Sequence, residues 1–213
     1  MNVHICVPGS GRGPFLAYLA QLAIHTVQAG IEINITSSRS SDLIALRTRL
    51  VGTALTSGAT HLLLLDDDVL VPSDCILRML EHDVDVVVGN YVKKDMSYTP
   101  VAANGLDEPV LSIGLSGTEL IMTAGLGCVF IKASVFDRIQ FPWFGYRWFH
   151  TAEQASVSVG VPDYSQWRGA GEDTWFFGRL ADAGIKVFVD HALSHNLVHW
   201  GECGWAEDGL VLA

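Results

Sequence analysis

The chain has 213 residues, of which 49% are hydrophobic and 17% are charged, and its formal net charge is −10 at pH 7. This length and composition are typical of one globular domain with a well-buried sheet, so we expect residues 1–213 to form a single domain. An acidic surface repels other polyanions, which argues against a nucleic-acid backbone or an anionic membrane as the main partner.

The sequence indicates a cytoplasmic protein. Its cysteines are isolated from one another in the chain: Cys6, Cys75, Cys128 and Cys203. Without a Cys-x-x-Cys pair, neither a zinc knuckle nor a disulfide scaffold is indicated, and we expect reduced, mostly buried thiols. The first residues lack the pattern of a signal peptide. The weakly polar stretch 110–131 is interrupted by Glu119 and several glycines, which argues against a membrane span.

The chain opens with a strand and a glycine-rich loop. Residues 3–7 form a β-rich run that Pro8 closes, and residues 9–14 lead into a predicted helix. The loop lacks the Gly-Lys-Ser/Thr of a P-loop. Ser37-Ser38 ends the second strand, where a dinucleotide-binding protein would place an acid for the ribose. What remains is a flexible loop that can touch a nucleoside through backbone groups.

Helices are predicted over residues 15–29 and 41–56, on either side of a strand at residues 31–36. Arg39, Arg47 and Arg49 lie in or beside the second helix of this otherwise acidic chain. Surface arginines usually only increase solubility. One that faced a crevice would suit a phosphate or a uracil ring, because guanidinium groups chelate and stack well.

The stretch from His61 to Val71 reads His-Leu-Leu-Leu-Leu-Asp-Asp-Asp-Val-Leu-Val. Such an apolar run is typical of a central strand that is buried on both faces, and its carboxyl end is where open α/β sheets bind ligands. Asp66, Asp67 and Asp68 stand there and repel one another, so the cluster indicates a cation site. Helix capping is the alternative, but the next helix has its own start at Pro72-Ser73-Asp74.

The order of elements predicts an α/β fold. Strand and helix alternate as far as the strand at residues 84–89, which favours a mostly parallel central sheet flanked by helices. Residues 96–124 break into short, glycine-punctuated apolar runs typical of a small antiparallel part. A strand and a short helix are then predicted over residues 125–131 and 133–136, and residues 154–170 are expected to form a mobile loop.

The last part of the chain carries further polar groups at the ends of elements. Glu172 and Asp173 precede a helix predicted over residues 174–183, and a strand at residues 186–190 precedes the histidines at 191, 195 and 199. The two acids could simply favour the first turn of the helix. Together with the Asp66–Asp68 cluster, however, carboxylates and an imidazole suit a divalent ion with open positions, and another carboxylate can act as a base.

Short segments in a fixed order carry a resemblance that covers nearly the whole chain. They are the helix with Arg47, the leucines with Asp66-x-Asp68, Tyr91-Val92-Lys93-Lys94, Gly125-Leu126-Gly127, Pro142-Trp143-Phe144, Gly171-Glu172-Asp173-Thr174-Trp175-Phe176-Phe177 and His199-Trp200-Gly201. In this order they resemble the GT-A glycosyltransferases of the large family 2 type. The resemblance is to the compact versions found in bacteria and bacteriophages, and it implies a GT-A fold.

The resemblance implies a metal-dependent transfer of a sugar from a nucleotide-diphosphate donor, expected to be a UDP-sugar. Mn²⁺ or Mg²⁺ would bridge the donor phosphates to Asp68, assisted by Asp66, whereas Asp67 is expected to matter least to the ion. His199 matches the family's C-terminal metal ligand, and His195 is the alternative. The imidazole favours a transition ion such as Mn²⁺.

The resemblance also implies roles for residues around the ion. Asp173 matches the base that deprotonates an acceptor hydroxyl for inverting attack on the sugar, and Glu172 could exchange roles with it. Pro8 and Arg47 fall where the family contacts the nucleoside. The chain lacks the extended C-terminal acceptor region of larger members, so a glycan, protein, lipid or modified base remains open as the acceptor.

Two other functions are compatible with parts of the pattern. A haloacid-dehalogenase-like phosphatase also has an apolar strand that ends in Asp-x-Asp, but it needs Thr or Val where Leu70 stands, and a whole βαβ unit precedes the strand here. A non-catalytic nucleotide-sugar-binding protein would not need the Glu172-Asp173 pair.

Overall fold

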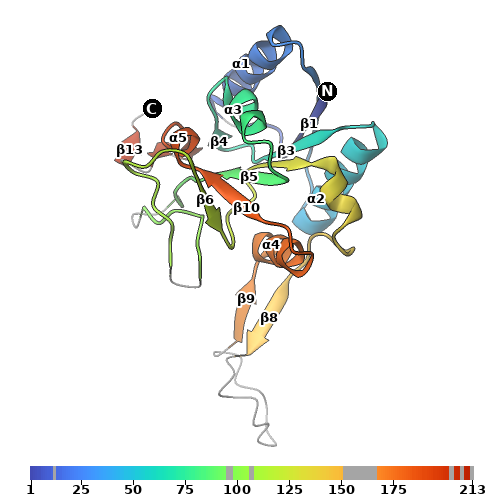
Figure 1. The fold of residues 1–213 in the computed structure, drawn as a ribbon, viewed down its shortest axis with the longest axis vertical. Helices are drawn as coiled ribbons and strands as arrows, with labels where there is room; N and C mark the ends of the chain where they lie inside the picture. Colours follow the sequence, from blue (N-terminus) through green and yellow to red (C-terminus); the bar gives the residue numbers. More distant parts are fainter. Residues whose placement is uncertain are drawn as a thin grey trace, which may run out of the picture.

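Helices cover both faces of a central sheet (Figure 1). The computed structural model describes residues 1–11, 13–94, 98–105, 108–150, 167–201, 204–206 and 209–211. The elements of the first half are β1 (Asn2–Pro8), α1 (Phe15–Gln28), β2 (Glu32–Ser38), α2 (Leu43–Thr56), β3 (His61–Leu65), β4 (Val69–Leu70), α3 (Cys75–Glu81) and β5 (Val86–Gly89).

The elements of the second half are β6 (Thr118–Ile121), β7 (Cys128–Lys132), the 3₁₀ helix η1 (Ala133–Asp137), β8 (Arg147–His150), β9 (Trp167–Ala170), α4 (Glu172–Asp182), β10 (Val187–Asp190), α5 (His191–Ser194), β11 (Val198–Trp200), β12 (Gly204–Ala206) and β13 (Gly209–Val211).

The main sheet has seven strands in the order β2-β1-β3-β7-β5-β10-β6. β1 pairs in parallel with β2 and β3, and β10 pairs in parallel with β5. β7 runs antiparallel to both of its neighbours, β3 and β5, and the edge strand β6 runs antiparallel to β10. The predicted mostly parallel α/β sheet flanked by helices is therefore confirmed. The sequence predicts β7, in the centre of the sheet, as a strand, but it does not predict that this strand runs antiparallel to its neighbours.

The leucines of β3 pack on both faces of the sheet, as the apolar run predicted. Leu62 and Leu64 belong to a core cluster with residues of α2 and α4, whereas Leu63 and Leu65 belong to a second cluster with residues of α1 and α3. All of them are at most 2% exposed. Because burying one leucine side chain contributes roughly 1.5–3 kcal/mol, these residues fix β3 in the interior of the sheet.

The helices that lead to the polar edge of the sheet start at local signals. Asp42 caps α2 by accepting a hydrogen bond from the Ala45 N–H at 2.9 Å, which agrees with the predicted start. Helix α4 begins at Glu172, earlier than the predicted Thr174, with Gly171 in an extended conformation at its N-cap. Both Glu172 and Asp173 therefore lie in the first turn, where the helix dipole favours carboxylates.

The β8–β9 hairpin corrects one prediction. Residues 167–170, expected to belong to a mobile loop, form β9, because their backbone groups pair with those of β8. The hairpin extends away from the sheet on the side of α4 (Figure 1). The rest of the predicted loop, residues 154–166, lies outside the described residues.

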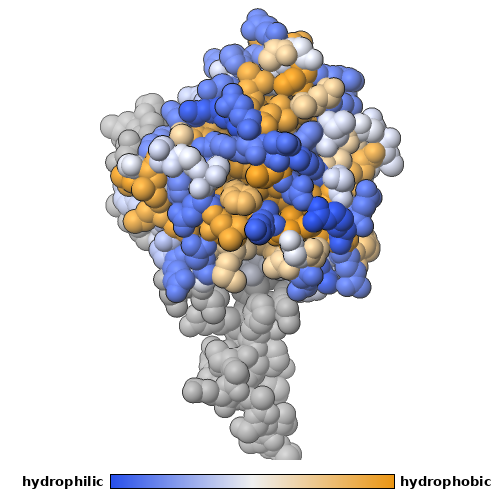
Figure 2. All heavy atoms as spheres, in the orientation of Figure 1, coloured by the Kyte–Doolittle hydropathy of each residue, from blue (hydrophilic) through white to orange (hydrophobic). Residues whose placement is uncertain are grey.

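The antiparallel part predicted within residues 96–124 includes β6 at the edge of the sheet. Here Leu120 and Met122 are 52% and 66% exposed. Figure 2 views the molecule in the orientation of Figure 1, and on this face apolar residues lie scattered between polar ones.

The expectations about thiols agree with the fold as far as it is described. Cys6, Cys75 and Cys128 are free and buried, and Cys203 lies outside the described residues. Within the described part of the chain, no helix has both the length and the apolar character needed to cross a membrane.

Candidate functional site

The polar residues singled out in the sequence gather around one edge of the sheet. Pro8 ends β1, and Asp66 follows the end of β3, whose strand direction is the same. The chain then turns, since the Val69 N–H donates to the Asp66 carbonyl at 3.1 Å. The three acids of the turn between β3 and β4 point into different surroundings, and each has its own partners.

Asp66 faces a buried arginine from α2. Arg47 is 5% exposed, and its Nη2 donates to Asp66 Oδ1 at 2.8 Å. Arg47 Nε lies 3.6 Å from Glu172 Oε1, in the first turn of α4. Burial alone would lower the pKa of Arg47, but the charges of Asp66 and Glu172 raise it above its ordinary value. The guanidinium therefore stays charged between two acids from distant parts of the chain.

Asp67 holds the N-terminal glycine loop. Its Oδ2 accepts hydrogen bonds from the backbone N–H groups of Ser10 and Gly11 at 3.0 and 3.2 Å, and the carboxylate is almost fully buried. A side chain at Gly9 would collide with it, because a Cβ there would lie 2.2 Å from Asp67 Cγ. Glycine at position 9 therefore allows the loop to approach this acid.

Asp68 faces two basic side chains. Lys94 Nζ donates to Asp68 Oδ2, and His199 Nε2 lies 3.6 Å from Asp68 Oδ1. Burial by itself would raise the pKa of Asp68, but His199 in its protonated form and the Lys94 ammonium lower it to about 2. The carboxylate is therefore ionised at neutral pH.

The C-terminal segment reaches Asp68 because its strand β11 pairs with β4, the short strand that follows the acidic turn, in a second sheet. This small sheet has the order β13-β12-β11-β4, and in it His199 is paired with Val69. The Trp200 N–H donates to the Asp68 carbonyl at 2.6 Å. The His199 ring also packs edge-on against Tyr91, with ring centroids 5.0 Å apart.

The hydrogen bonds of His199 define which ring nitrogen faces Asp68. Its Nδ1 lies 2.8 Å from the Val92 carbonyl, which can only accept, so Nδ1 carries the proton. In the neutral imidazole, Nε2 then presents its lone pair toward the Asp68 carboxylate. Two lone-pair groups facing each other need a cation or a proton between them.

The other histidines of this region have different partners. His195 Nε2 lies 2.6 Å from the Ser112 carbonyl. His191 is buried, with Nδ1 3.1 Å from Ser112 Oγ and Nε2 3.3 Å from Glu119 Oε2. Of the two histidines considered as metal ligands, the structure thus brings His199 to Asp68 and holds His195 against Ser112.

Asp173 lies in the first turn of α4, next to Glu172. Its Oδ1 accepts a hydrogen bond from the Thr174 N–H at 2.7 Å. Glu172 faces Arg47, whereas the acid next to it forms this local contact within its own turn. The structure brings Glu172 to Asp66 through Arg47, and it places Asp173 one residue beyond that contact.

A cavity of about 380 Å³ opens beside the acidic turn. Pro8, Gly9, Asp67 and Arg39 line it, together with residues at the start of α2. Pro8, which the resemblance assigns to the nucleoside, thus borders a cavity together with Asp67. Among the described residues, Arg47 does not line this cavity, whereas Arg39, another of the arginines considered for a phosphate or a uracil ring, does.

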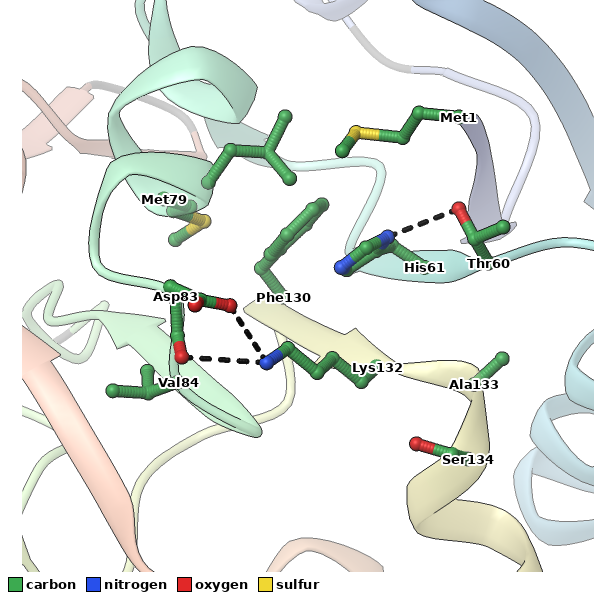
Figure 3. A pocket seen from close by; sticks show the side chains of 11 residues that line it. Met1, Thr60, His61, Met79, Asp83, Val84, Phe130, Lys132, Ala133 and Ser134 are labelled. Carbon is green, nitrogen blue, oxygen red and sulfur yellow. Dashed lines mark hydrogen bonds and ion pairs between the residues drawn. The ribbon is translucent and has the colours of Figure 1, made fainter.

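Another cavity, of about 390 Å³, lies at the opposite edge of the sheet. His61, where β3 begins, lines it together with Lys132, where β7 ends. Figure 3 shows Lys132 paired with Asp83 and His61 in contact with Thr60. Because β3 separates this cavity from Asp66, it does not belong to the acidic site.

Lys94 and Tyr91 are site residues whose roles the sequence did not predict. The buried Tyr91 hydroxyl accepts a hydrogen bond from the Gly127 N–H at 3.0 Å, and burial raises the pKa of this hydroxyl. Both residues follow β5, at the same edge as the acids. Their position after a parallel strand could have indicated that they lie near the acids. It does not, however, indicate which side chain points toward Asp68.

Comparison with known proteins shows the fold. No protein-family model matches the chain, and no curated protein sequence matches it. Among solved structures, the chain is similar to the crystal structure of A197 from STIV, with a TM-score of 0.64 and 20% sequence identity. The match covers 100% of this chain and 94% of that one. The two proteins therefore share an α/β fold over their lengths.

Proposed function

We propose that this protein is a metal-dependent glycosyltransferase that moves a sugar from a nucleotide-diphosphate donor, such as a UDP-sugar, to an acceptor hydroxyl. The observation that carries the proposal is the pairing of Asp68 with the Nε2 lone pair of His199 at 3.6 Å. A carboxylate and an imidazole arranged in this way suit a divalent transition ion such as Mn²⁺, although Mg²⁺ is also compatible with the carboxylate.

The two protein ligands fit an ion whose remaining coordination positions are filled by its substrate. Among the described residues, no three His, Cys, Asp or Glu side chains are grouped closely enough to hold a metal ion. Ions that act on nucleotides commonly use one or two protein carboxylates and take the remaining ligands from phosphates and water. Asp68 and His199 would hold the ion in this manner, and the Val92 carbonyl would fix the His199 ring behind it.

The surroundings supply the other contacts that a donor needs. The cavity at Pro8 and Arg39 would take the nucleoside, next to the loop that Asp67 holds in place. Lys94, which pairs with Asp68, would turn toward the diphosphate and share its charge. When bound, the ion would stabilise the negative charge that develops on the departing nucleoside diphosphate.

Asp173 is proposed as the base for the acceptor. Its carboxylate lies in the first turn of α4, where Oδ1 accepts a hydrogen bond from the Thr174 N–H. A carboxylate in this place can act as a general base. Because Glu172 is engaged by Arg47, Asp173 is the acid of this pair that we assign to the acceptor hydroxyl. Attack on the anomeric carbon from the side opposite to the diphosphate would invert the configuration of the sugar.

The proposal is tested by titration calorimetry with UDP, with and without Mn²⁺, on the wild type, Asp68→Asn and His199→Gln. UDP should bind the wild type only when Mn²⁺ is present. In both variants, Mn²⁺ should no longer increase the affinity for UDP. Asp83→Asn, at the opposite edge of the sheet, is the matched control and should bind like the wild type. Equal binding in every case would rule out an ion bridge between Asp68 and the donor.

The phosphatase alternative makes a different demand on Asp66. That chemistry requires a carboxylate oxygen of Asp66 to attack phosphorus, whereas Asp66 Oδ1 accepts a hydrogen bond from the buried Arg47. We therefore expect no phosphate release from 4-nitrophenyl phosphate, and slow hydrolysis of a UDP-sugar instead. Turnover of the ester that Asp66→Asn abolishes would favour the phosphatase.

A further inference from the structure

Arg47 connects three elements that are far apart in the sequence. It belongs to α2, its Nη2 donates to Asp66 after β3, and its Nε faces Glu172 at the start of α4. The Asp66 and Glu172 side chains are 25% and 16% exposed, whereas that of Arg47 is 6% exposed. The arginine is thus the buried centre of an ionic unit whose two acids lie nearer the surface.

One nitrogen of this arginine is left without a hydrogen bond. Arg47 Nε is buried and has no hydrogen-bond partner in the described structure. Its 3.6 Å separation from Glu172 Oε1 is longer than a hydrogen bond but short enough for a strong charge interaction in a buried place. Glu172 therefore holds the guanidinium by charge, and Asp66 holds it by charge and a hydrogen bond.

This arrangement gives the two outer acids of the turn different partners. Asp66 Oδ1 is committed to Arg47, whereas Asp68 faces His199 and Lys94. A direct bond from Asp66 to the ion would compete with the hydrogen bond that compensates a buried positive charge. Leaving such a charge uncompensated is costly, so the competition favours the arginine.

We propose that Arg47 is a positioning residue that ties Asp66 to Glu172, and that Asp66 acts on the reaction through this tie and not as a ligand of the ion. The tie fixes the first turn of α4, and with it Asp173, relative to the pair of Asp68 and His199. The roles of Asp173 and the ion rest on the proposed function. The tie between the three side chains does not, so it can be tested separately.

The tie is tested by urea unfolding of Asp66→Asn, Glu172→Gln and the double variant, each in the wild type and in Arg47→Met. With Arg47 present, either single change should raise the unfolding equilibrium constant, by on the order of 100-fold for Asp66→Asn, since the buried guanidinium then keeps only one of its two charge partners and loses its hydrogen bond to Asp66. In Arg47→Met the same changes should be neutral or stabilising. Unchanged effects in Arg47→Met would overturn the tie.

An exposed pair provides the matched control. Arg138 and Asp85 form an ion pair whose side chains are 48% and 35% exposed. Asp85→Asn should change stability little, in the wild type and in Arg138→Met alike, because exposed pairs contribute little. If Asp66→Asn does not fold, the same question is decided by introducing Glu172→Gln into Arg47→Lys and into Arg47→Met. Lysine keeps the positive charge, so Glu172→Gln should still lower the stability of Arg47→Lys but not that of Arg47→Met.

The role of Asp66 is tested by Mn²⁺ binding in the presence of UDP. Asp66→Asn should lower the Mn²⁺ affinity by no more than about 10- to 100-fold, a loss typical of a residue behind the ligands, whereas Asp68→Asn should abolish it. Arg47→Lys should lower kcat of donor turnover with little change in KM. Loss of Mn²⁺ from Asp66→Asn equal to that from Asp68→Asn would overturn the assignment. A wild type that binds no Mn²⁺ or UDP would refute the proposed function, while the unfolding cycle would still decide the tie.

Discussion

His199 directs its Nδ1–H away from Asp68 and toward the main-chain carbonyl of Val92, at 2.8 Å. Its Nε2 therefore faces Asp68 as an acceptor in the neutral ring, and this is the arrangement that metal-bound histidines adopt. Because the Val92 contact is made by the backbone, substitution at Val92 leaves it in place. The consequence can be tested at the two histidines of this segment.

His199→Gln should weaken Mn²⁺ binding in the presence of UDP by more than about 100-fold, beyond the loss typical of residues that only support a ligand. His195→Gln should leave the affinity close to that of the wild type, because His195 contacts the Ser112 carbonyl instead. Calorimetry with Mn²⁺ on both variants measures the difference. The reverse ranking would make His195 the ligand and would require a different register of the C-terminal segment.

Gly127 is predicted to tolerate no side chain. A Cβ there would lie 2.5 Å from the Tyr91 hydroxyl oxygen, which also accepts the Gly127 N–H. Since Tyr91 is fully packed, Gly127→Ala should lower the free energy of unfolding by about 1–3 kcal/mol. A Cβ at Gly178 in α4, by contrast, would lie in open space.

Gly178→Ala is therefore the control for Gly127→Ala. Alanine in the middle of a helix is favoured over glycine, so this variant should gain roughly 0.5–1 kcal/mol. Urea unfolding of both variants measures the contrast. Equal effects at the two positions would mean that Tyr91 moves aside and that its contact with Gly127 is not rigid.

Asp67→Asn should loosen the glycine loop without removing the side chain. The charge that strengthens the hydrogen bonds from the Ser10 and Gly11 N–H groups is lost, at a cost of about 1–3 kcal/mol in stability. UDP affinity should fall together with stability, because the loop borders the cavity at Pro8. Asp137→Asn, at an exposed acid of η1, is the control and should change neither quantity. UDP binding that is unaffected by Asp67→Asn would place the nucleoside elsewhere.

His4 is predicted to make stability depend on pH. It is 3% exposed, and its ring nitrogens lie 3.1 Å from Ser57 Oγ and 2.8 Å from Thr36 Oγ1. Burial lowers the pKa of His4 below the ordinary value of 6.5. The unfolded chain therefore takes up a proton first as the pH falls, so stability contributed by neutral His4 is present above pH 6.5 and is lost below it.

His4→Gln should flatten the decline of stability between about pH 7.5 and pH 5. Burial and the charge of Lys132 also lower the pKa of His61, so some decline should remain until His61→Gln is added. Urea unfolding at a series of pH values measures these slopes. A slope that is unchanged in His4→Gln would show that other groups account for the acid sensitivity.

The parts of the fold that depend on local pattern could be predicted from the sequence. The leucines of β3, the start of α2 at Asp42 and the position of the acids after β3 all follow from spacing and composition of neighbouring residues. The reversed direction of β7 could not be predicted, because strand order depends on pairing between segments that are far apart in the chain. The hairpin strand β9 was missed for the same reason.

The sequence predicted which types of residue form the candidate site, but it predicted few of the contacts between them. Asp68 and His199 come together, but the pairing of Arg47 with Asp66 and Glu172 and the hold of Asp67 on the glycine loop depend on tertiary packing. One signal was present for Arg47. It lies beside Leu46 and on the same helix stripe as Leu50 and Ala54, and an arginine at such a position indicates a buried ionic partner.

The place of β7 in the sheet also bears on how the protein is made. β3 gains its second neighbour only when residues 128–132 are available, although its first neighbour, β1, precedes it in the chain. A nascent or truncated chain that stops before β7 would leave an apolar edge with unpaired backbone groups, which is a template for aggregation. We therefore expect chains that stop before Lys132 to be more prone to aggregation than the full chain, since β3 can be paired on both of its edges only when β7 is present.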